Sequence, residues 1–202
     1  MIAIIDYNMG NLFSVTQAVS FIGREWRIID KVDDLKFFKY CILPGVGNFG
    51  LGMEELRSRN FENGILQYVQ EGKKLLGICM GMQMLLDSSE EAPGVKGLGL
   101  IKGKVLEFDR NAGEKVPQMG WNQVEFMDKN NPFFRNVADK SYFYFVHSYY
   151  AKVDNQANSL GETEFINRYS SIIGEKNVLG YQFHPEKSSD AGITLLRNFF
   201  DK

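Results

Sequence analysis

The sequence predicts an α/β fold with a mostly parallel central sheet flanked by helices and with antiparallel strands added in the second half. Over residues 1–86, short apolar runs alternate with segments of helical periodicity, which favours a parallel sheet covered by helices on both faces. Beyond residue 100, strand-like segments follow one another closely without a long helix between them, which is typical of antiparallel strands. The 202 residues show no repeat or linker, so we expect a single domain over residues 1–202.

The first half contains the elements expected for the parallel part of the sheet. Ile2–Ile5 is a short apolar run closed by Asp6, and apolar residues at helical spacing follow from Leu12 to Ile22 before Gly23 ends the helix. The remaining expected elements are strands at Trp26–Ile29 and Tyr40–Leu43, a helical region from Gly50 to Glu71, a strand at Leu75–Cys79 and a helix at 80–86.

The second half changes to closely spaced strand-like segments, and a final helix closes the chain at about Asp190 to Phe200. The expected strands are Val105–Phe108, Asn122–Phe126, Tyr142–Val146, Tyr149–Val153, Ser171–Gly174 and Val178–Phe183.

Composition excludes several classes of protein. The net charge is −2 and there is no basic run, so nothing suggests nucleic-acid binding. No apolar stretch approaches the roughly 18 residues of a membrane-spanning helix, and the residues after Met1 lack the features of a signal peptide. Two cysteines, Cys41 and Cys79, make neither a disulfide framework nor a four-cysteine zinc site. We therefore expect a cytoplasmic protein, not associated with membranes, that uses no metal or cofactor.

The strongest local signal for chemistry is Gly77-Ile78-Cys79-Met80-Gly81, between an expected buried strand and an expected helix. This is the pattern of a nucleophile elbow with cysteine in place of serine. The tight turn needs small flanking residues, the helix N-terminus favours a thiolate, and the Met80 amide is placed to stabilise an oxyanion. The alternative for Cys79 is a buried core thiol, because free cysteine is among the most buried residue types.

A cysteine nucleophile needs a base, and the chain has two histidines, His147 and His184. His184 follows a strand-like run, in Gln182-Phe183-His184-Pro185-Glu186. Residues two apart in an extended segment project to the same side, so Glu186 can orient the ring of His184 and support its protonated form. The alternative is a solvated surface pair, which is disfavoured at a strand end, where open parallel sheets bind ligands.

A glycine-containing segment, Pro44-Gly45-Val46-Gly47, follows the third expected strand. Glycines at a strand end let the backbone approach a ligand closely. A backbone N–H near Gly47 is therefore a candidate for the second oxyanion donor. The alternative is a plain tight turn.

These segments together resemble a known family. The triad class of glutamine amidotransferases is indicated by Pro44–Gly47, Gly77–Gln83 and Phe183–Ser188 in this order. A resemblance to the glutaminase subunits of imidazole glycerol phosphate synthase comes from Asp6–Leu12, Pro117–Asn122 and Tyr144–Tyr149. The similarity extends from Asp6 to Ser188, which is nearly the whole chain, and implies the fold of the class-I glutamine amidotransferases.

The resemblance implies a reaction, a substrate and a partner. Cys79, His184 and Glu186 would form a triad that releases glutamate and ammonia from L-glutamine. The ammonia would pass to a (β/α)₈-barrel cyclase subunit, bound as a heterodimer, which makes imidazole glycerol phosphate and an aminoimidazole carboxamide ribotide. Bound glutamine would be held by Gln83, Glu91, Ser148 and Tyr149. The implied partner interface contains Asn11, Gln118, Met119, Trp121, Asn122 and Lys187.

The chain departs from the family pattern at two positions. Gln118 stands where the family usually has histidine, and Asn8 where it usually has glycine. Both changes lie outside the catalytic residues and bear on partner and pathway. The alternative to histidine biosynthesis is a similar pair that supplies nitrogen to an amidino sugar in a surface-polysaccharide pathway.

Other classes of protein also remain as alternatives. Gln83 and the His-Pro-Glu segment argue against a cysteine peptidase, and the complete triad argues against an inactive binding scaffold. Of the residues left over, His147 is interpreted as a structural or pocket-wall histidine and Cys41 as a core thiol.

Overall fold

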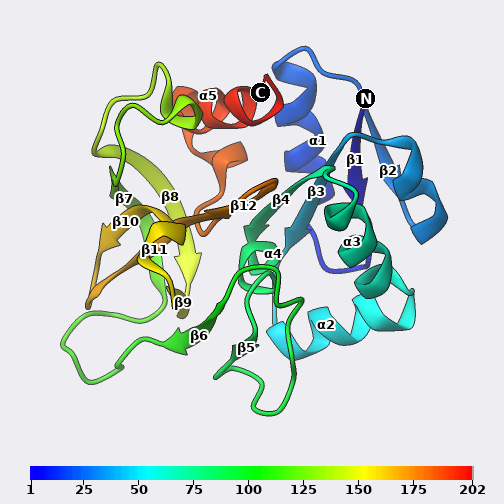
Figure 1. Ribbon diagram of the computed structural model, residues 1–202. Coiled ribbons are helices and arrows are strands. Elements are labelled where there is room, and N and C mark those ends of the chain that lie inside the picture. Colours follow the sequence, from blue (N-terminus) through cyan, green and yellow to red (C-terminus); the bar gives the residue numbers. More distant parts are fainter. Residues whose placement is uncertain (202) are drawn as a thin grey trace.

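The computed structural model describes residues 1–201, and in this part of the chain one sheet of twelve strands forms the centre of the molecule (Figure 1). Its main path runs β2-β1-β3-β4-β12-β11-β10-β7-β8. The strands at the start of this path are parallel: β2 (Trp26–Ile29), β1 (Ile2–Ile5), β3 (Tyr40–Gly45), β4 (Lys74–Cys79) and β12 (Val178–Tyr181). The predicted α/β fold is confirmed.

The rest of the path is antiparallel, as the second half of the sequence predicts. It contains β11 (Arg168–Glu175), β10 (Ser159–Glu164), β7 (Gln118–Phe126) and β8 (Ser141–His147). A branch leaves β11 through β9 (Tyr149–Val153), which pairs with β6 (Gly103–Glu107), and β6 pairs in turn with the short β5 (Ser88–Ser89).

Helices cover both faces of the parallel strands. Figure 1 shows α1 (Leu12–Phe21) and α5 (Ser189–Phe200) together on one side, and α2 (Phe49–Ser58) and α3 (Phe61–Gln70) on the other. Adjacent residues of β4 show why helices are needed on both faces of the sheet. Leu75 packs into the core beneath α2 and α3, whereas Leu76 packs into the core beneath α1 and α5. A strand buried on both faces reads as a continuous apolar run.

The structure adds detail to one sequence expectation about helices and strands and differs from the sequence analysis at two other places. The helical region from Gly50 to Glu71 is two helices, because Asn60 takes a left-handed conformation (φ 62°) between them. The helix expected over 80–86 ends at Gln83, giving α4 (Met80–Gln83), and the chain then tightens into i→i−3 bonds such as Leu85 N–H to the Met82 carbonyl. Strand β10 was not expected, because Ser159–Glu164 is mostly polar and has no alternating apolar pattern.

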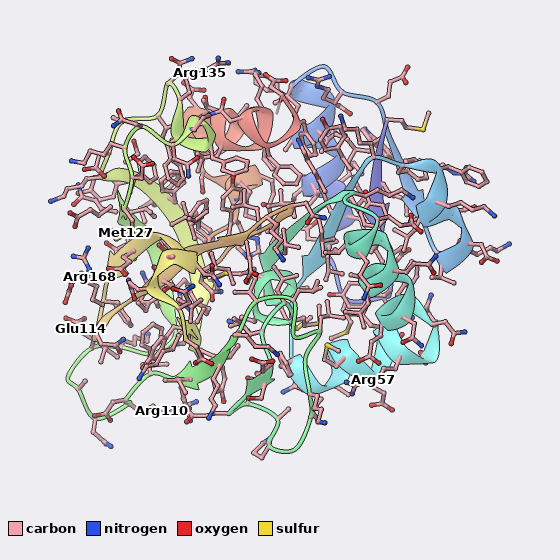
Figure 2. The ribbon with its side chains drawn as sticks, viewed as in Figure 1. Arg57, Arg110, Glu114, Met127, Arg135 and Arg168 are labelled. Carbon is pink, nitrogen blue, oxygen red and sulfur yellow. The ribbon has the colours of Figure 1, made fainter. Side chains whose placement is uncertain are left out.

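Short 3₁₀ turns complete the chain: η1 (Val32–Phe37), η2 (Pro132–Phe134), η3 (Gln156–Asn158) and η4 (Pro185–Lys187). Charged side chains such as Arg57, Arg110 and Arg135 point outward from the ribbon (Figure 2). Across residues 1–201, no helix has the length and apolar character to cross a membrane.

Candidate active site

Cys79 stands at a strained elbow between β4 and α4. Its backbone dihedrals, φ 55° and ψ −113°, lie outside the regions that side chains normally allow. A Cβ on Gly81 would stand 1.9 Å from the Leu43 carbonyl oxygen, and one on Gly77 would stand 2.6 Å from the Gly81 oxygen. The elbow therefore requires glycine on both sides, as the sequence pattern predicts.

His184 and Glu186 lie side by side, with His184 Nδ1 2.8 Å from Glu186 Oε1. Both side chains are almost fully buried. The sequence analysis expected an extended segment to place Glu186 beside His184, and this expectation was wrong. His184 is followed by the 3₁₀ turn η4, and the turn, rather than strand alternation, brings the carboxylate back to the ring.

The environment of His184 favours its protonated form. Burial by itself lowers the pKa of His184, but the Cys79 sulfur and the Glu186 carboxylate outweigh burial and raise the pKa to about 10. Its Nε2 has no hydrogen-bond partner within the described chain. That nitrogen is therefore available to exchange a proton with a group in the cavity that His184 lines.

A cavity of about 320 Å³ collects the predicted residues at the carboxyl end of the parallel strands. Glu186 is the one member of the predicted catalytic, substrate-binding and oxyanion sets that does not line it, because it lies behind His184. The cavity is lined by Val46, Gly47, Cys79, Met80, Gln83, Glu91, Pro117, Val146, His147, Ser148, Tyr149 and His184.

Hydrogen bonds fix two of the predicted glutamine-binding side chains. Gln83 Nε2 donates to the Tyr149 carbonyl at 3.0 Å and to Gln182 Oε1 at 3.1 Å. Glu91 Oε2 accepts the Phe49 N–H at 2.7 Å, at the first residue of α2. Each residue is thus oriented by hydrogen bonds to neighbouring groups, Gln182 and Phe49 among them, while remaining part of the cavity wall.

Within the segment Pro44–Gly47, Val46 and Gly47 line the cavity. Gly47 has φ +102°, a conformation that favours glycine. The Val46 N–H donates to the Met9 carbonyl at 2.8 Å, and the Tyr7 hydroxyl donates to the Pro44 carbonyl at 2.7 Å. In this conformation the Val46 N–H is engaged by Met9 and does not serve the cavity.

His147 is a neutral part of the cavity wall. Its Nδ1 lies 2.7 Å from the Tyr149 carbonyl and its Nε2 lies 3.2 Å from the Tyr169 hydroxyl. Burial, opposed by the bond to Tyr149, lowers the pKa of His147 to about 4. A histidine without a carboxylate partner in this position is a weaker base candidate than His184. The other leftover residue, Cys41, is buried within β3.

The residues predicted for a partner interface divide into two groups. Met119 and Trp121 are large apolar side chains exposed on β7 to 67% and 52%, and Asn11 and Lys187 are also exposed. Gln118 is buried instead, because strand alternation turns it inward, where its Oε1 accepts from the Tyr169 hydroxyl at 2.8 Å. The Asn122 side chain is half-buried and donates to the Glu164 carbonyl at 2.8 Å.

Sequence reasoning missed three buried polar residues around the site: Tyr7, Tyr169 and Gln182. Each forms its hydrogen bonds with residues distant in sequence, so spacing gave no signal for Tyr7 or Tyr169. For Gln182, its place two residues before His184 was the available signal. Among residues 1–201, no group of three or more His, Cys, Asp or Glu side chains is arranged to hold a metal ion.

Comparison with known families gives a consistent result. Residues 4–202 match the family model described as glutamine amidotransferase class-I. The imidazole glycerol phosphate synthase subunit HisH of Sulfurimonas denitrificans is 46% identical over 202 residues, with 98% of this chain and 97% of the relative covered. The HisH subunit of Methanocaldococcus jannaschii is 44% identical and covers 100% and 99% of the two chains.

Solved structures agree on the fold at lower identity. A crystal structure of a glutamine amidotransferase aligns with a TM-score of 0.77 at 20% identity, covering 98% of this chain and 97% of that one. PurLQS from Thermotoga maritima aligns with a TM-score of 0.76, also at 20% identity, covering 99% and 97%. The chain belongs to the class-I glutamine amidotransferases and, within them, to the family of HisH subunits of imidazole glycerol phosphate synthase.

Proposed function

We propose that this chain hydrolyses L-glutamine to glutamate and ammonia, with Cys79 as nucleophile, His184 as base and Glu186 as the residue that orients and charges the base. The observation that carries the proposal is the position of Cys79 on a strained elbow, in one cavity with His184, whose other ring nitrogen is held by a buried carboxylate. Nucleophile, base and orienting group are the three parts of a hydrolytic triad.

The reaction proceeds through a glutamyl thioester. The Cys79 thiolate attacks the side-chain amide carbon, and backbone N–H groups at Met80 and near Gly47 stabilise the oxyanion. Protonated His184 gives its proton to the amide nitrogen, which leaves as ammonia. Neutral His184 then takes a proton from water, the water oxygen attacks the thioester carbon, and glutamate and the thiolate are released.

The cavity wall supplies groups for the amino-acid end of glutamine. Glu91 is the acidic residue of the lining and suits the α-ammonium group, and the Ser148–Tyr149 backbone suits the α-carboxylate. Gln83 has both hydrogens of its amide directed at Tyr149 and Gln182, so its carbonyl oxygen is the group left to accept from the substrate.

The ammonia is delivered to a cyclase partner, which we propose is a (β/α)₈ barrel bound as a heterodimer in the cytoplasm. Relatives over 40% identical to this chain are HisH subunits of imidazole glycerol phosphate synthase, which favours histidine biosynthesis over amidino-sugar synthesis. The chain acts as one domain over residues 1–202. The proposed partner face centres on exposed Met119 and Trp121, with Asn11, Asn122 and Lys187, while buried Gln118 supports it from within.

Replacement of the nucleophile tests the proposal directly. In a complex with the cyclase, Cys79→Ala should abolish glutamine-dependent product formation but leave formation from ammonium salts intact, because the cyclase needs only ammonia. Glutamate release and product formation are measured with each nitrogen source.

Cys41→Ala is the matched control, since it removes the other thiol from the core and should retain glutaminase activity. A Cys79→Ala complex that still releases glutamate from glutamine would refute the nucleophile assignment. Peptide cleavage by the wild-type chain in place of glutamine hydrolysis would instead indicate a peptidase.

A further inference from the structure

Gln182 lies directly behind the nucleophile without lining the cavity. It is fully buried and follows the last residue of β12, which pairs in parallel with β4 through Tyr181 and Ile78. The next residue on each strand is therefore Gln182 on one and Cys79 on the other. The Gln182 backbone is held in place by its N–H, which donates to the Ser171 carbonyl at 2.9 Å.

A short series of hydrogen bonds links Gln182 to a backbone carbonyl on β9. Gln83 Nε2 donates to the Tyr149 carbonyl at 3.0 Å and to Gln182 Oε1 at 3.1 Å. With its oxygen turned toward Gln83, Gln182 directs Nε2 at Cys79 Sγ, 4.0 Å away. The series therefore ends in an N–H donor at the sulfur.

The direction of this series is set by chemistry. A backbone carbonyl only accepts hydrogen bonds, so the Gln83 amide must present its NH₂ to Tyr149. The same NH₂ then meets Gln182, which must present its oxygen and is left with its own NH₂ for Cys79. Reversal of either amide would place two like groups against each other and leave buried donors or acceptors unpaired.

We propose that Gln182 is a positioning residue for the nucleophile: it holds a hydrogen-bond donor against the sulfur, which stabilises the thiolate and fixes its direction. The proposal rests on the proposed role of Cys79. A hydrogen bond to an ionised acceptor is stronger than one to a neutral acceptor, so the donor favours the charged state of the sulfur. Gln182 thus stabilises the Cys79 thiolate from the core side, as His184 does from the cavity side.

Gln182→Met tests the proposal, because methionine has a similar shape and no N–H donor. Loss of a hydrogen bond to a charged group should slow alkylation of Cys79 by iodoacetamide about 10- to 100-fold in the isolated chain. In the complex with the cyclase, kcat for glutamine should fall by a similar factor. KM should change little, because Gln182 does not line the cavity.

Gln83→Met provides a second variant that leaves Gln182 in place but removes the group that sets its direction. Alkylation of Cys79 should slow by a smaller factor, since the Gln182 amide can then turn its oxygen toward the sulfur. Ser171→Ala is the matched control: it removes a buried hydroxyl that pairs with Thr163 near Gln182 but has no contact with Cys79. It should reduce thermal stability and leave the alkylation rate unchanged.

An alkylation rate in Gln182→Met equal to that of the wild type, with the variant folded, would overturn the positioning role and leave the glutaminase proposal standing. Failure of the proposed role of Cys79 would appear separately, as glutamine hydrolysis that survives Cys79→Ala, and failure of the glutaminase proposal as a wild-type complex that does not hydrolyse glutamine.

Discussion

The two histidines of the chain sit in one cavity and have opposite environments. His184 has the Glu186 carboxylate on one side and the Cys79 sulfur near the other, and these raise its pKa to about 10 against the effect of burial. His147 is buried among aromatic rings and bonds a carbonyl, and burial lowers its pKa to about 4. The two histidines therefore differ in charge: His184 favours the protonated form, and His147 is a neutral part of the cavity wall.

These environments predict a maximum of stability near the ordinary histidine pKa. A folded-state pKa above 6.5 at His184 contributes stability below pH 6.5 that is lost as pH rises toward 10. A folded-state pKa below 6.5 at His147 contributes stability above pH 6.5 that is lost as pH falls toward 4. Urea unfolding of the chain between pH 4 and pH 10 should show the free energy of unfolding falling along an alkaline limb above pH 6.5 and along an acid limb below pH 6.5.

Single variants assign each limb to its residue. His184→Asn should flatten the alkaline limb and leave the acid limb, and His147→Asn should do the reverse. If both variants kept the wild-type profile, the pH dependence would belong to other groups and the two environments described here would not govern it.

At the scale of the element, the segment Pro44–Gly47 covers the end of β3 and the start of the loop to α2, and it carries the candidate oxyanion donor on this side of the cavity. Its first carbonyl is held by the Tyr7 hydroxyl, and the Val46 N–H is held by the Met9 carbonyl. For the Val46 N–H to face the cavity, its peptide must therefore turn. Glycines on either side of Val46 make such a rotation sterically inexpensive.

Gly47→Ala should lower partner-stimulated turnover of glutamine. Gly47 has φ +102°, which alanine reaches only with strain of about 1–3 kcal/mol, so the loop should shift to relieve it. A Cβ at this position would lie 3.2 Å from Met9 Cε, a flexible side-chain end, so the effect comes from the backbone and not from a clash. Glutamate release in the presence of the cyclase measures it.

Gly72→Ala is the control for backbone strain, since Gly72 has φ +78°, follows α3 and would meet nothing within 4 Å. It should lower stability without changing turnover. Turnover of Gly47→Ala equal to that of the wild type would place the required rotation elsewhere in the loop.

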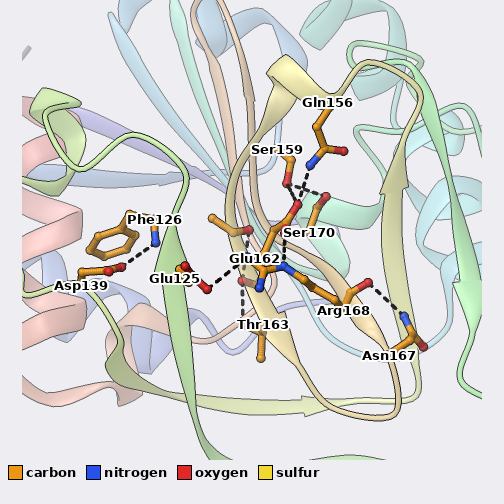
Figure 3. A network of polar contacts seen from close by, with 12 residues as sticks. Glu125, Phe126, Asp139, Gln156, Ser159, Glu162, Thr163, Asn167, Arg168 and Ser170 are labelled. Carbon is orange, nitrogen blue, oxygen red and sulfur yellow. Dashed lines mark hydrogen bonds and ion pairs between the residues drawn. The ribbon is translucent and has the colours of Figure 1, made fainter.

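Another element, strand β10, depends on a polar network that is visible only in the folded chain (Figure 3). Glu162 accepts hydrogen bonds from Arg168, Gln156 and Ser159, and Arg168 also pairs with Glu125 on β7. Burial raises the pKa of Glu162, but these donors outweigh burial and lower it. The network joins β10 to its neighbours and replaces the apolar alternation that the strand lacks.

At the scale of the whole molecule, the site is assembled by three adjacent parallel strands. β3, β4 and β12 end at the same edge of the sheet, where they deliver the Pro44–Gly47 loop, Cys79, and the segment with Gln182 and His184. Gly45 is paired with Cys79 across β3 and β4. Ligands bind at this edge in open α/β sheets, and here the edge also carries the groups proposed to be catalytic.

The isolated chain should release glutamate slowly, because the Val46 N–H is engaged by Met9 and one oxyanion donor is therefore missing. Lack of one such donor costs about 10²–10³ in rate. We expect glutamate release to rise when the cyclase binds and again when an analogue of its acceptor substrate is added. Equal rates for the chain alone, the complex and the complex with analogue would contradict this regulation.

The pathway is tested in cells. The chain, expressed with its own cyclase partner, should restore growth without histidine to a strain that lacks the histidine-pathway glutaminase, as expected for a HisH family member. Cys79→Ala should fail to do so. Failure of the wild-type pair despite soluble expression would favour the amidino-sugar alternative.

The sequence by itself determined the class of fold, because apolar runs and helical periodicity are local properties of the chain. It also determined the identity of the candidate nucleophile, because the elbow needs glycine on both sides of Cys79. It suggested the pairing of His184 with Glu186 two positions later, although the turn η4 and not an extended segment makes that contact. Long motifs were sufficient to indicate the family.

Only the tertiary structure decided how these residues are held. Arg168 on β11 joins Glu162 on the polar strand β10 to Glu125 on β7, and the helix after Cys79 ends at Gln83, where i→i−3 bonds follow. Gln118 turns inward to Tyr169, and Gln182 is oriented through Gln83 by a carbonyl on β9. The contacts of Gln118 and Gln182 join residues 51 and 99 positions apart. Their geometry depends on which strands become neighbours, and that is settled by the packing of the whole sheet.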